Sequence, residues 1–172
     1  MAKTAGEIDV ALRRRILRAL ERDARRTPAQ IADEVGADPA TVAAAIAEAE
    51  RQGIIRRYKT IIAWDRLGPE PVVALIDVSV QPERDAGFDR IAERIARYPE
   101  VRSVHLVSGA SDLRVVVEGP SIEAIGSFVA QNLAPIEGVR ATETHFLMKA
   151  YKEDGELLSE EPAPDHRLPV TP

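Results

Sequence analysis

The stretch from Thr27 to Ile55 constrains the fold most, because it signals two short helices joined by a turn of fixed length. Thr27 is followed by Pro28 and Gln30, which gives a helix cap, a first-turn proline and a capping-box partner in order. Apolar residues then recur at helical spacing on one face: Ile31, Ala32 and Val35. The first helix of this pair is therefore expected to begin at Pro28, after an earlier helix predicted from Ile8 to Asp23.

A second helix is signalled directly afterwards. Gly36 is expected to end the first helix, because glycine has no Cβ that would hinder the backbone turn. Asp38 then begins the same pattern of cap and proline again. Its inward face carries Val42, Ile46 and Ala49, and Gly53 ends it. An ordinary αα-hairpin is the alternative, but two tandem caps at this spacing favour a helix-turn-helix.

Composition sets the protein class. The chain has 172 residues, of which 45% are apolar and 30% charged, so it holds one large or two small globular domains. It has no cysteine, which excludes disulfides and thiolate metal sites. No apolar run is long enough to span a membrane, and residues 1–7 lack the apolar part of a signal peptide. We expect a soluble cytoplasmic protein without a membrane partner.

Charge is unevenly distributed along the chain. Residues 1–64 carry 12 Lys and Arg against 9 Asp and Glu, whereas residues 65–172 carry 11 against 19. The difference favours a basic module joined to an acidic one. Gly68, Pro69 and Pro71 mark residues 64–71 as a linker, so the helix-turn-helix domain is predicted to span residues 1–63.

The segment from Ile54 to Ile62 is rich in β-branched residues and positive charge, and it predicts a strand that leaves the helical module. Arg56, Arg57 and Lys59 have two interpretations here. They contact the DNA backbone as a wing does, or they keep an exposed strand edge from aggregating.

The second half alternates strands and helices. Strands are predicted at residues 72–80, 101–107, 113–117 and 139–148, and helices at 88–98 and 121–132. The order βαββαβ predicts a ferredoxin-like domain over residues 72–151, with both helices on one face of an antiparallel sheet, so the chain is α+β. The strands read as apolar on both faces, which predicts a homodimer that covers the second face. Residues 152–172 are acidic and proline-rich, and we expect a tail with little structure.

Signals of catalysis are weak. His105, His145 and His166 are widely separated, and no paired ligand motif accompanies them, so neither a metal nor another cofactor is expected. His105 lies in a predicted strand, where a hydrogen-bonded structural role is expected. Ser108, Ser111 and Asp112 follow it, but spacing alone does not establish a catalytic triad. We therefore predict no enzyme and no catalytic residue.

Two motifs make the chain similar to a known family. The segment RQGIIRRYKTIIAWDRLG contains the end of an E-x-x-G-I-I-x-x-Y pattern from Glu50 to Tyr58, and HLVSGASDL contains Gly109-x-x-Asp112 between two strands. From about Ile8 to Tyr151 the chain resembles the Lrp/AsnC transcription regulators, which have a winged helix-turn-helix and a C-terminal RAM domain. The resemblance implies dimers, commonly four to an octamer, and an amino acid or related effector bound between subunits that shifts assembly and DNA affinity.

The second helix of the motif departs from this family. It usually carries Arg, Lys or Ser where it enters the major groove, but Ala40 to Glu48 is mostly alanine. Alanine contacts a thymine methyl group but does not read guanine as Arg does, so we expect backbone contacts to hold double-stranded DNA. The alternative is a DNA module that has decayed or become a protein-binding surface. The candidate DNA contacts are Thr27, Gln30, Asp38, Ala40, Thr41, Ala44, Ala45, Arg56, Arg57 and Lys59.

The candidate effector site is the loop Ser108, Gly109, Ala110, Ser111 and Asp112. Gly109 allows backbone N–H groups to face a carboxylate, and Asp112 offers a charge for an ammonium group, which together suit a zwitterion. The resemblance places the amino-acid site of the family here, although Ala110 and Ser111 replace bulkier residues. The alternative is a glycine hairpin turn in which Asp112 bonds its own backbone.

An enzyme of the same architecture is a further alternative. Siroheme decarboxylases use His and aromatic residues around a tetrapyrrole, and this chain has His105. It has only three Phe, three Tyr and one Trp, however, and it keeps the regulator-like loop at Gly109.

Overall fold

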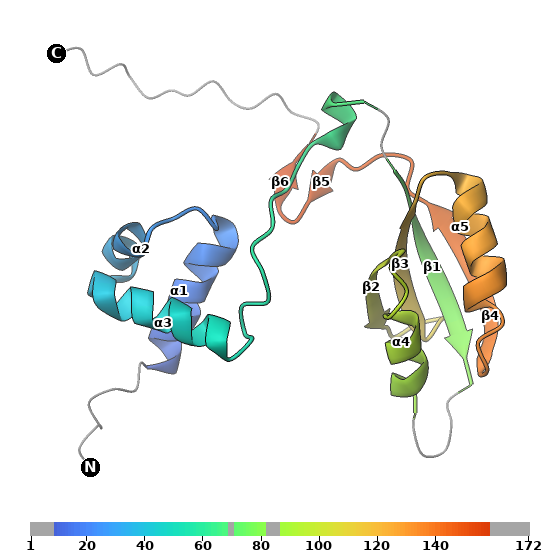
Figure 1. Cartoon of the computed structure of the whole chain (residues 1–172), viewed down its shortest axis with the longest axis horizontal. Helices are drawn as coiled ribbons and strands as arrows, with labels where there is room; N and C mark the ends of the chain where they lie inside the picture. Colours follow the sequence, from blue (N-terminus) through green and yellow to red (C-terminus); the bar gives the residue numbers. More distant parts are fainter. Residues whose placement is uncertain (1–8, 69–70, 82–86, 159–172) are drawn as a thin grey trace. The chain divides into compact units, whose positions relative to one another are not determined.

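The computed structural model describes residues 9–68, 71–81 and 87–158, and the chain divides into two compact units, Met1–Thr60 and Ile61–Pro172 (Figure 1). Each unit has a hydrophobic core of its own. The helices of the first unit and the sheet of the second are therefore stabilised by separate sets of buried side chains.

The first unit is a bundle of three helices. They are α1 (Val10–Arg22), α2 (Pro28–Val35) and α3 (Pro39–Arg51). Ala32 is 1% exposed in the core, where its small side chain fits between the helices. The other buried residues of this core are Ile16, Ala19, Leu20, Ile31, Val35, Val42 and Ala45. The predicted helix-turn-helix is confirmed.

Side chains cap both helices of the motif. The Gln30 N–H donates to Thr27 Oγ1 at 3.3 Å, and the Thr27 N–H donates to Gln30 Oε1 at 2.8 Å, which completes the predicted capping box. Gly36 ends α2 in the left-handed conformation, with φ of 66°. Asp38 Oδ2 accepts the Ala40 and Thr41 N–H groups at 2.9 and 3.2 Å. In the described part of the first unit, only α1 begins without a side-chain bond from its cap, Asp9.

The predicted strand from Ile54 to Ile62 is wrong, because the structure gives this segment no β-pairing. Its first two N–H groups, those of Ile54 and Ile55, donate to the Ala49 carbonyl at 2.9 and 3.1 Å and so extend the end of α3. In the described part of the first unit, no other strand is present to pair with the remainder. A wing is therefore not formed here, and the exit segment is irregular.

The second unit follows the predicted order. A short 3-10 turn, η1 (Trp64–Arg66), comes first. The sheet contains β1 (Val72–Val80), β2 (Val101–Leu106), β3 (Leu113–Gly119) and β4 (Val139–Phe146) in the order β2-β3-β1-β4, with neighbours antiparallel. The helices are α4 (Asp89–Ile95) and α5 (Ile122–Phe128), which continues into a π-helical turn, η2 (Val129–Leu133). The α+β ferredoxin-like prediction is confirmed.

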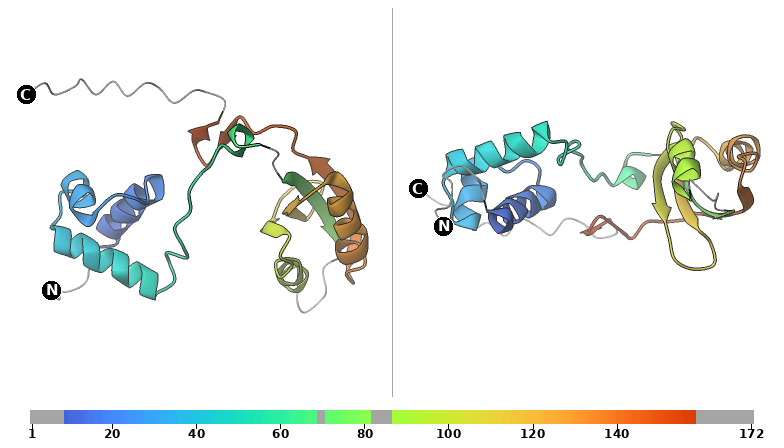
Figure 2. Two further views of the ribbon diagram at one scale, coloured as in Figure 1. Left: turned by 45° about the horizontal axis from the view of Figure 1, so that its top comes forward. Right: turned by 90° about the horizontal axis from the view of Figure 1, so that it is seen from below.

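The two faces of the sheet differ. Figure 2 shows α4 and α5 on the same side of the sheet. On that side Ile76, Val78 and Val115 are fully buried against helix residues such as Ile95 and Phe128. On the other face Asp77 lies opposite Arg114 and Glu143, so this face is mixed rather than apolar as expected.

The chain beyond the sheet begins with a hairpin. The strands β5 (Lys152–Glu153) and β6 (Glu156–Leu157) pair across a turn in which Asp154 and Gly155 have φ of 45° and 95°. The expectation of a tail with little structure is therefore wrong for residues 152–157, because turn-forming residues lie between two short pairing segments. Residues 159–172 lie outside the described residues.

Candidate functional site

The middle of the solvent-facing side of α3 is formed by alanines, with Pro39, Glu50 and Arg51 exposed at the two ends of the helix. Ala40, Ala43, Ala44 and Ala47 are exposed, whereas Thr41 is half-buried. An alanine face has no hydrogen-bonding side chain with which to distinguish bases in a DNA groove. Its smooth surface does allow close approach of the helix to a duplex.

Ala45 does not face solvent, so its prediction as a DNA contact is wrong. It is 1% exposed and packs in the core with Val42, because both lie on the inward side of α3. Ala43 and Ala47 were not among the predicted contacts, although they share the exposed side with Ala40. The inward face had been assigned to Val42, Ile46 and Ala49, and helical periodicity from Val42 would also have placed Ala43 and Ala47 on the exposed side.

Three other candidates act as caps in this structure. The side chains of Thr27 and Gln30 bond to each other's residues at the start of α2, and Asp38 caps α3. Their role is to fix where the two helices begin. The N-terminus of α3 carries the partial positive charge of the helix dipole, which attracts phosphate groups. In this structure that charge lies beside the negative charge of Asp38.

Two acidic side chains near the helix-turn-helix, those of Glu34 and Glu48, are paired with basic ones. Glu34 forms ion pairs with Arg26 and Arg22, and these hydrogen bonds hold the pKa of its carboxyl below the usual value. Glu48 forms an ion pair with Arg51 and also accepts a hydrogen bond from Gln52. Glu48 therefore does not present an unpaired negative charge to DNA.

The exit segment after α3 carries exposed cations. Arg56, Arg57 and Lys59 are exposed, and no ion pair joins them to another residue in the described part of the chain. Tyr58 lies among them, and its hydroxyl donates to Glu50 Oε1 at 2.7 Å. The segment is thus attached to the last turn of α3 while its cations remain available to phosphate groups.

The loop after β2 is held to the sheet through Asp112. The Asp112 N–H donates to the Val78 carbonyl at 3.2 Å, and Asp112 Oδ2 accepts the Val80 N–H at 2.8 Å. The carboxylate thus bonds the backbone of the neighbouring strand β1. Ser108, Gly109 and Ala110 are exposed, and Gly109 has φ of 147°.

A charged cluster lies on the open face of the sheet beside this loop. Arg114 donates from Nε and Nη2 to the two oxygens of Asp77 at 2.8 and 2.9 Å. These bonds, together with the charges of Arg114 and His145 and a bond from Ser111, lower the pKa of Asp77. Ser111 is therefore engaged within the subunit and is less available to a ligand than its neighbours in the loop.

The histidines are spread over the same face. His145 Nε2 lies 3.8 Å from Asp77 Oδ2 and 3.7 Å from Glu143 Oε1. His105 is exposed in β2 opposite Arg114, so the expected structural hydrogen bond to His105 is absent from the described residues. His166 lies outside the described residues. Within the described ranges no three His, Asp or Glu residues are arranged to hold a metal ion, and no helix is long and apolar enough to cross a membrane.

Comparison with known proteins assigns both units. Residues 73–157 match the model described as Lrp/AsnC ligand binding domain, and residues 11–56 match winged helix-turn-helix DNA-binding. The uncharacterised HTH-type transcriptional regulator YugG of Bacillus subtilis is 40% identical over 158 residues, which cover 91% of this chain and 95% of YugG. The match to the ligand-binding domain includes the hairpin β5–β6.

Solved structures agree with this assignment. The crystal structure of MtbAldR has a TM-score of 0.69 and 29% identity, covering 84% of this chain and 97% of that one. A transcriptional regulator of Neisseria meningitidis, solved as a complex with L-Met, shares the fold with a TM-score of 0.65 and 24% identity, covering 86% of this chain and 94% of that one. The proteins matched here are regulators, which argues against the siroheme decarboxylase alternative.

Proposed function

Because the chain belongs to the Lrp/AsnC family of DNA-binding transcription regulators, we propose that an amino acid or related small molecule controls its assembly and its affinity for double-stranded DNA. The chain is a regulator with a ligand-binding domain rather than an enzyme. A protein with this function acts in the cytoplasm, where the DNA is. We assign DNA binding to the first unit and effector binding to the second.

DNA binding is proposed to rest on backbone contacts. Arg56, Arg57 and Lys59 are the exposed cations that follow α3, and their contacts with phosphate groups carry no sequence information. Ala40 and Ala44 approach the groove but offer only methyl contacts. We therefore expect DNA binding that is sensitive to salt and discriminates weakly between sequences.

The effector is proposed to bind at the loop from Ser108 to Asp112. The observation that carries this proposal is the Val80 N–H bond to Asp112 Oδ2, which holds the carboxylate in place before any ligand arrives. A fixed carboxylate suits an ammonium group, and the exposed backbone at Gly109 suits a carboxylate. The L-Met complex of the Neisseria regulator offers an amino acid as a precedent for a protein of this fold.

Homodimerisation is proposed to complete this site. Several large apolar side chains of the second unit are exposed, and Met148 is 92% exposed. Burial of these side chains against a second copy of the chain would stabilise a dimer. The loop from Ser108 to Asp112, at an end of the sheet, would then lie beside the neighbouring subunit. The other exposed members are Ile61, Ile62, Trp64, Leu67, Leu106, Ile122, Leu147, Tyr151 and Leu157. Further assembly of dimers into an octamer would bring such loops together. A monomer in analytical ultracentrifugation would contradict the proposed dimer.

The effector proposal is tested with two substitutions at one position. Asp112→Asn keeps a carbonyl oxygen that accepts the Val80 N–H but removes the negative charge, whereas Asp112→Ala removes both. Isothermal titration of the twenty amino acids into wild type should find at least one ligand, and both variants should lose it. The Asp112→Asn variant should unfold at a temperature closer to wild type than the alanine variant does.

A gel shift against the upstream region of its own gene, with and without the ligand, tests control of DNA affinity. The proposal predicts a shifted midpoint with the ligand in wild type and no shift in Asp112→Asn. No heat for any amino acid, or equal binding by Asp112→Asn, would remove this loop from the site. No DNA binding at low salt would favour the alternative of a decayed DNA module.

A further inference from the structure

The exposed side of α1, the first helix of the DNA-binding unit, carries a cluster of arginines. On the inward side of this helix, Ile16 and Ala19 are fully buried in the core. On the outward side, Arg14, Arg15 and Arg18 are exposed. Residues three and four positions apart are neighbours on a helix surface, so these three side chains lie together and form the α1 cluster.

No carboxylate neutralises the α1 cluster among the described residues. Its three guanidinium groups form no ion pair and no hydrogen bond there, whereas Arg22, one turn further along, is paired with Glu34. Glu21 is exposed near the end of α1 but is not paired with the cluster. Like charges one helical turn apart repel each other, and the first turn of α1 contains no acidic residue. The cluster therefore does not stabilise α1 itself.

The α1 cluster begins at the same end of the first unit as the exit segment. Arg13, which directly precedes the cluster, donates from Nη1 to Gln52 Oε1 at 3.5 Å, so the start of α1 lies beside the end of α3. The exit segment leaves α3 at this end. Its first cation, Arg56, stays close to it, because a Cβ at Gly53 would come 3.5 Å from Arg56 Nη1. The two groups of cations thus lie next to each other.

Arg13 gives an independent indication that an anion belongs at this end of the unit. Its Nε is buried and has no hydrogen-bond partner in the described part of the chain. The side-chain acceptor that it does have, Gln52 Oε1, is neutral. Buried polar groups are normally paired, and an unpaired one in a charged side chain requires an explanation such as a bound ion. A phosphate group near this guanidinium would compensate its charge.

We propose that Arg14, Arg15 and Arg18 bind the phosphate backbone of the same duplex that the exit segment contacts. The proposal rests on the proposed DNA-binding function, and α1 lies within residues 11–56, which match winged helix-turn-helix DNA-binding. Guanidinium groups present paired N–H donors that suit phosphate oxygens. Successive turns of the cluster are separated by about 6 Å along the helix, and each DNA strand offers a phosphate about every 3.4 Å along its axis. The long side chains therefore have several phosphates within reach.

The α1 cluster doubles the number of exposed cations available to a duplex. The exit segment supplies Arg56, Arg57 and Lys59, and the exposed alanines of α3 supply none. A DNA-binding unit with little base readout depends on backbone contacts for its affinity. The cluster thus supplies, from α1, charge that α3 does not carry.

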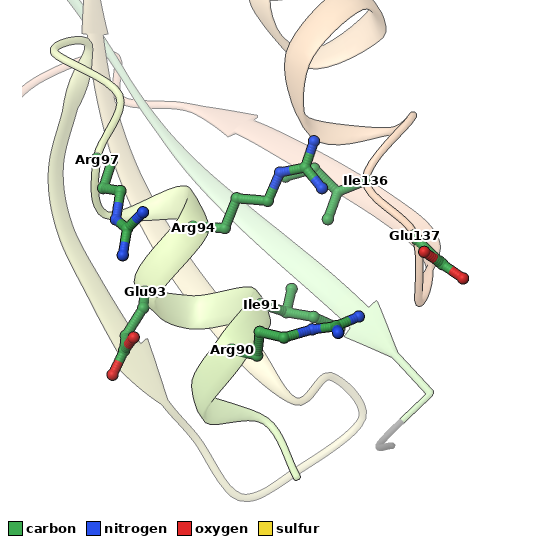
Figure 3. Close-up of a pocket in the computed structure, with 7 residues that line it drawn as sticks. All are labelled: Arg90, Ile91, Glu93, Arg94, Arg97, Ile136 and Glu137. Carbon is green, nitrogen blue, oxygen red and sulfur yellow. The ribbon is translucent and has the colours of Figure 1, made fainter. Parts of the chain in front are cut away.

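Arginines elsewhere in the chain are arranged differently. In the second unit, arginines of α4 line a cavity together with the carboxylates of Glu93 and Glu137 (Figure 3). Carboxylates among the cations repel a phosphate backbone. The α1 cluster contains no carboxylate, so the charge arrangement favours DNA at α1 rather than at α4.

The test measures DNA affinity of the full-length chain by fluorescence anisotropy over a range of salt concentrations. The probes are a duplex from the upstream region of its own gene and a scrambled duplex. Arg14→Gln/Arg15→Gln/Arg18→Gln should reduce the slope of log affinity against log salt by about three units, one for each lost phosphate contact, and equally for both duplexes. Arg14→Lys/Arg15→Lys/Arg18→Lys keeps the charges and should retain most of the slope.

The matched control is Arg94→Gln/Arg97→Gln/Arg102→Gln, which removes the same charge from exposed positions of the second unit and should keep the slope of wild type. Circular dichroism should show equal helix content in all variants. The proposal is overturned if the glutamine variant of α1 keeps the slope of wild type, if the control lowers it equally, or if the lysine variant loses as much as the glutamine variant. An unchanged slope with altered sedimentation in the absence of DNA would assign the cluster instead to an acidic protein surface, such as the second unit of another copy. If wild type binds neither duplex at low salt, the DNA-binding function itself fails, whereas binding with an unchanged slope contradicts only the role of α1.

Discussion

Tyr58 donates its hydroxyl proton to Glu50 Oε1 at 2.7 Å, and this bond attaches the segment that leaves the helix-turn-helix to the end of α3. Between the two residues, the Ile54 and Ile55 N–H groups bond the Ala49 carbonyl, and Ile55 packs against the core. The E-x-x-G-I-I-x-x-Y pattern therefore has a physical explanation. It directs the chain out of α3 along one path and so positions the cations Arg56 and Arg57.

Tyr58→Phe should loosen this path with little loss of overall stability. The bond lies at the surface, so its removal should cost about 1 kcal/mol or less in the free energy of unfolding. DNA affinity should fall several-fold, because the cations beside Tyr58 lose their fixed position. Fluorescence anisotropy with a labelled duplex measures this loss, and Tyr151→Phe, in the second unit, serves as the control. Unchanged affinity in Tyr58→Phe would show that the bond does not position the cations.

Asp77 should make the stability of the second unit depend on pH. Arg114 donates two hydrogen bonds to its carboxylate and, with weaker contributions from His145 and Ser111, lowers its pKa from the ordinary 3.8. A carboxyl whose pKa falls on folding stabilises the protein above its unfolded pKa, and this contribution is lost as pH drops through the folded value. Asp77→Asn should therefore be less stable than wild type near neutral pH, and the difference should shrink below about pH 4.

Urea denaturation at a series of pH values checks this expectation. Glu143→Gln is the control, because it removes a charge from the same face at a side chain that is 76% exposed. At each pH, the urea midpoint of Glu143→Gln should lie closer to that of wild type than the midpoint of Asp77→Asn does. A difference between Asp77→Asn and wild type that stays constant from neutral pH to about pH 3 would contradict the assignment.

Thr27→Ala should destabilise the first unit by about 1 kcal/mol, because the capping box at the start of α2 loses its hydroxyl. Thr60→Ala is the matched control, since Thr60 is exposed in the exit segment and lies outside any helix. Thermal unfolding followed by circular dichroism measures both. If the two variants unfold at the same temperature, the capping box contributes less than its geometry indicates.

Local patterns were sufficient to predict the helices and the main strands, because caps, prolines and apolar spacing act within a few residues. Thr27 and Gln30 are close together in sequence, and their capping box was predicted from sequence and is present. The segment from Ile54 to Ile62 does not form a strand, because it has no partner strand among the described residues of the first unit. Its composition indicates strand propensity but does not reveal whether a partner exists. Asp77 and Arg114 are far apart in sequence, so their pairing on the open face depends on the register of β1 and β3.

The candidate sites were predicted less completely than the fold. Alanines carry no amphipathic signal of their own, so Ala45 was placed on the surface of α3 although it is buried. The bond from Val80 to Asp112 joins residues 32 positions apart and follows from strand pairing rather than from the loop sequence. The close approach of the turn at Gly138 to Ile91 of α4 likewise joins distant parts of the chain.

Gly138→Ala should destabilise the second unit by about 1–3 kcal/mol, because the added Cβ meets Ile91 and the backbone φ is unfavourable for alanine. Gly126→Ala is the control. Gly126 lies within α5, where an added Cβ would have nothing within 4 Å, and alanine there should be neutral or stabilising by up to about 1 kcal/mol. Chemical denaturation compares the two, and equal stability would show that the turn moves without cost.

Arg56→Ala/Arg57→Ala should weaken binding to all duplexes by a similar factor. Phosphate contacts release counterions, so each lost contact should reduce the slope of log affinity against log salt by about one unit. The exposed alanines of α3 leave little base readout, and a scrambled duplex should therefore bind nearly as well as the chosen sequence. Anisotropy titrations of both duplexes over a range of salt concentrations measure the slope and the discrimination together. Arg102→Ala/Lys149→Ala, with the same change of net charge outside the first unit, should leave the slope unchanged. Strong preference for one duplex at physiological salt would show that α3 reads bases despite its alanine surface.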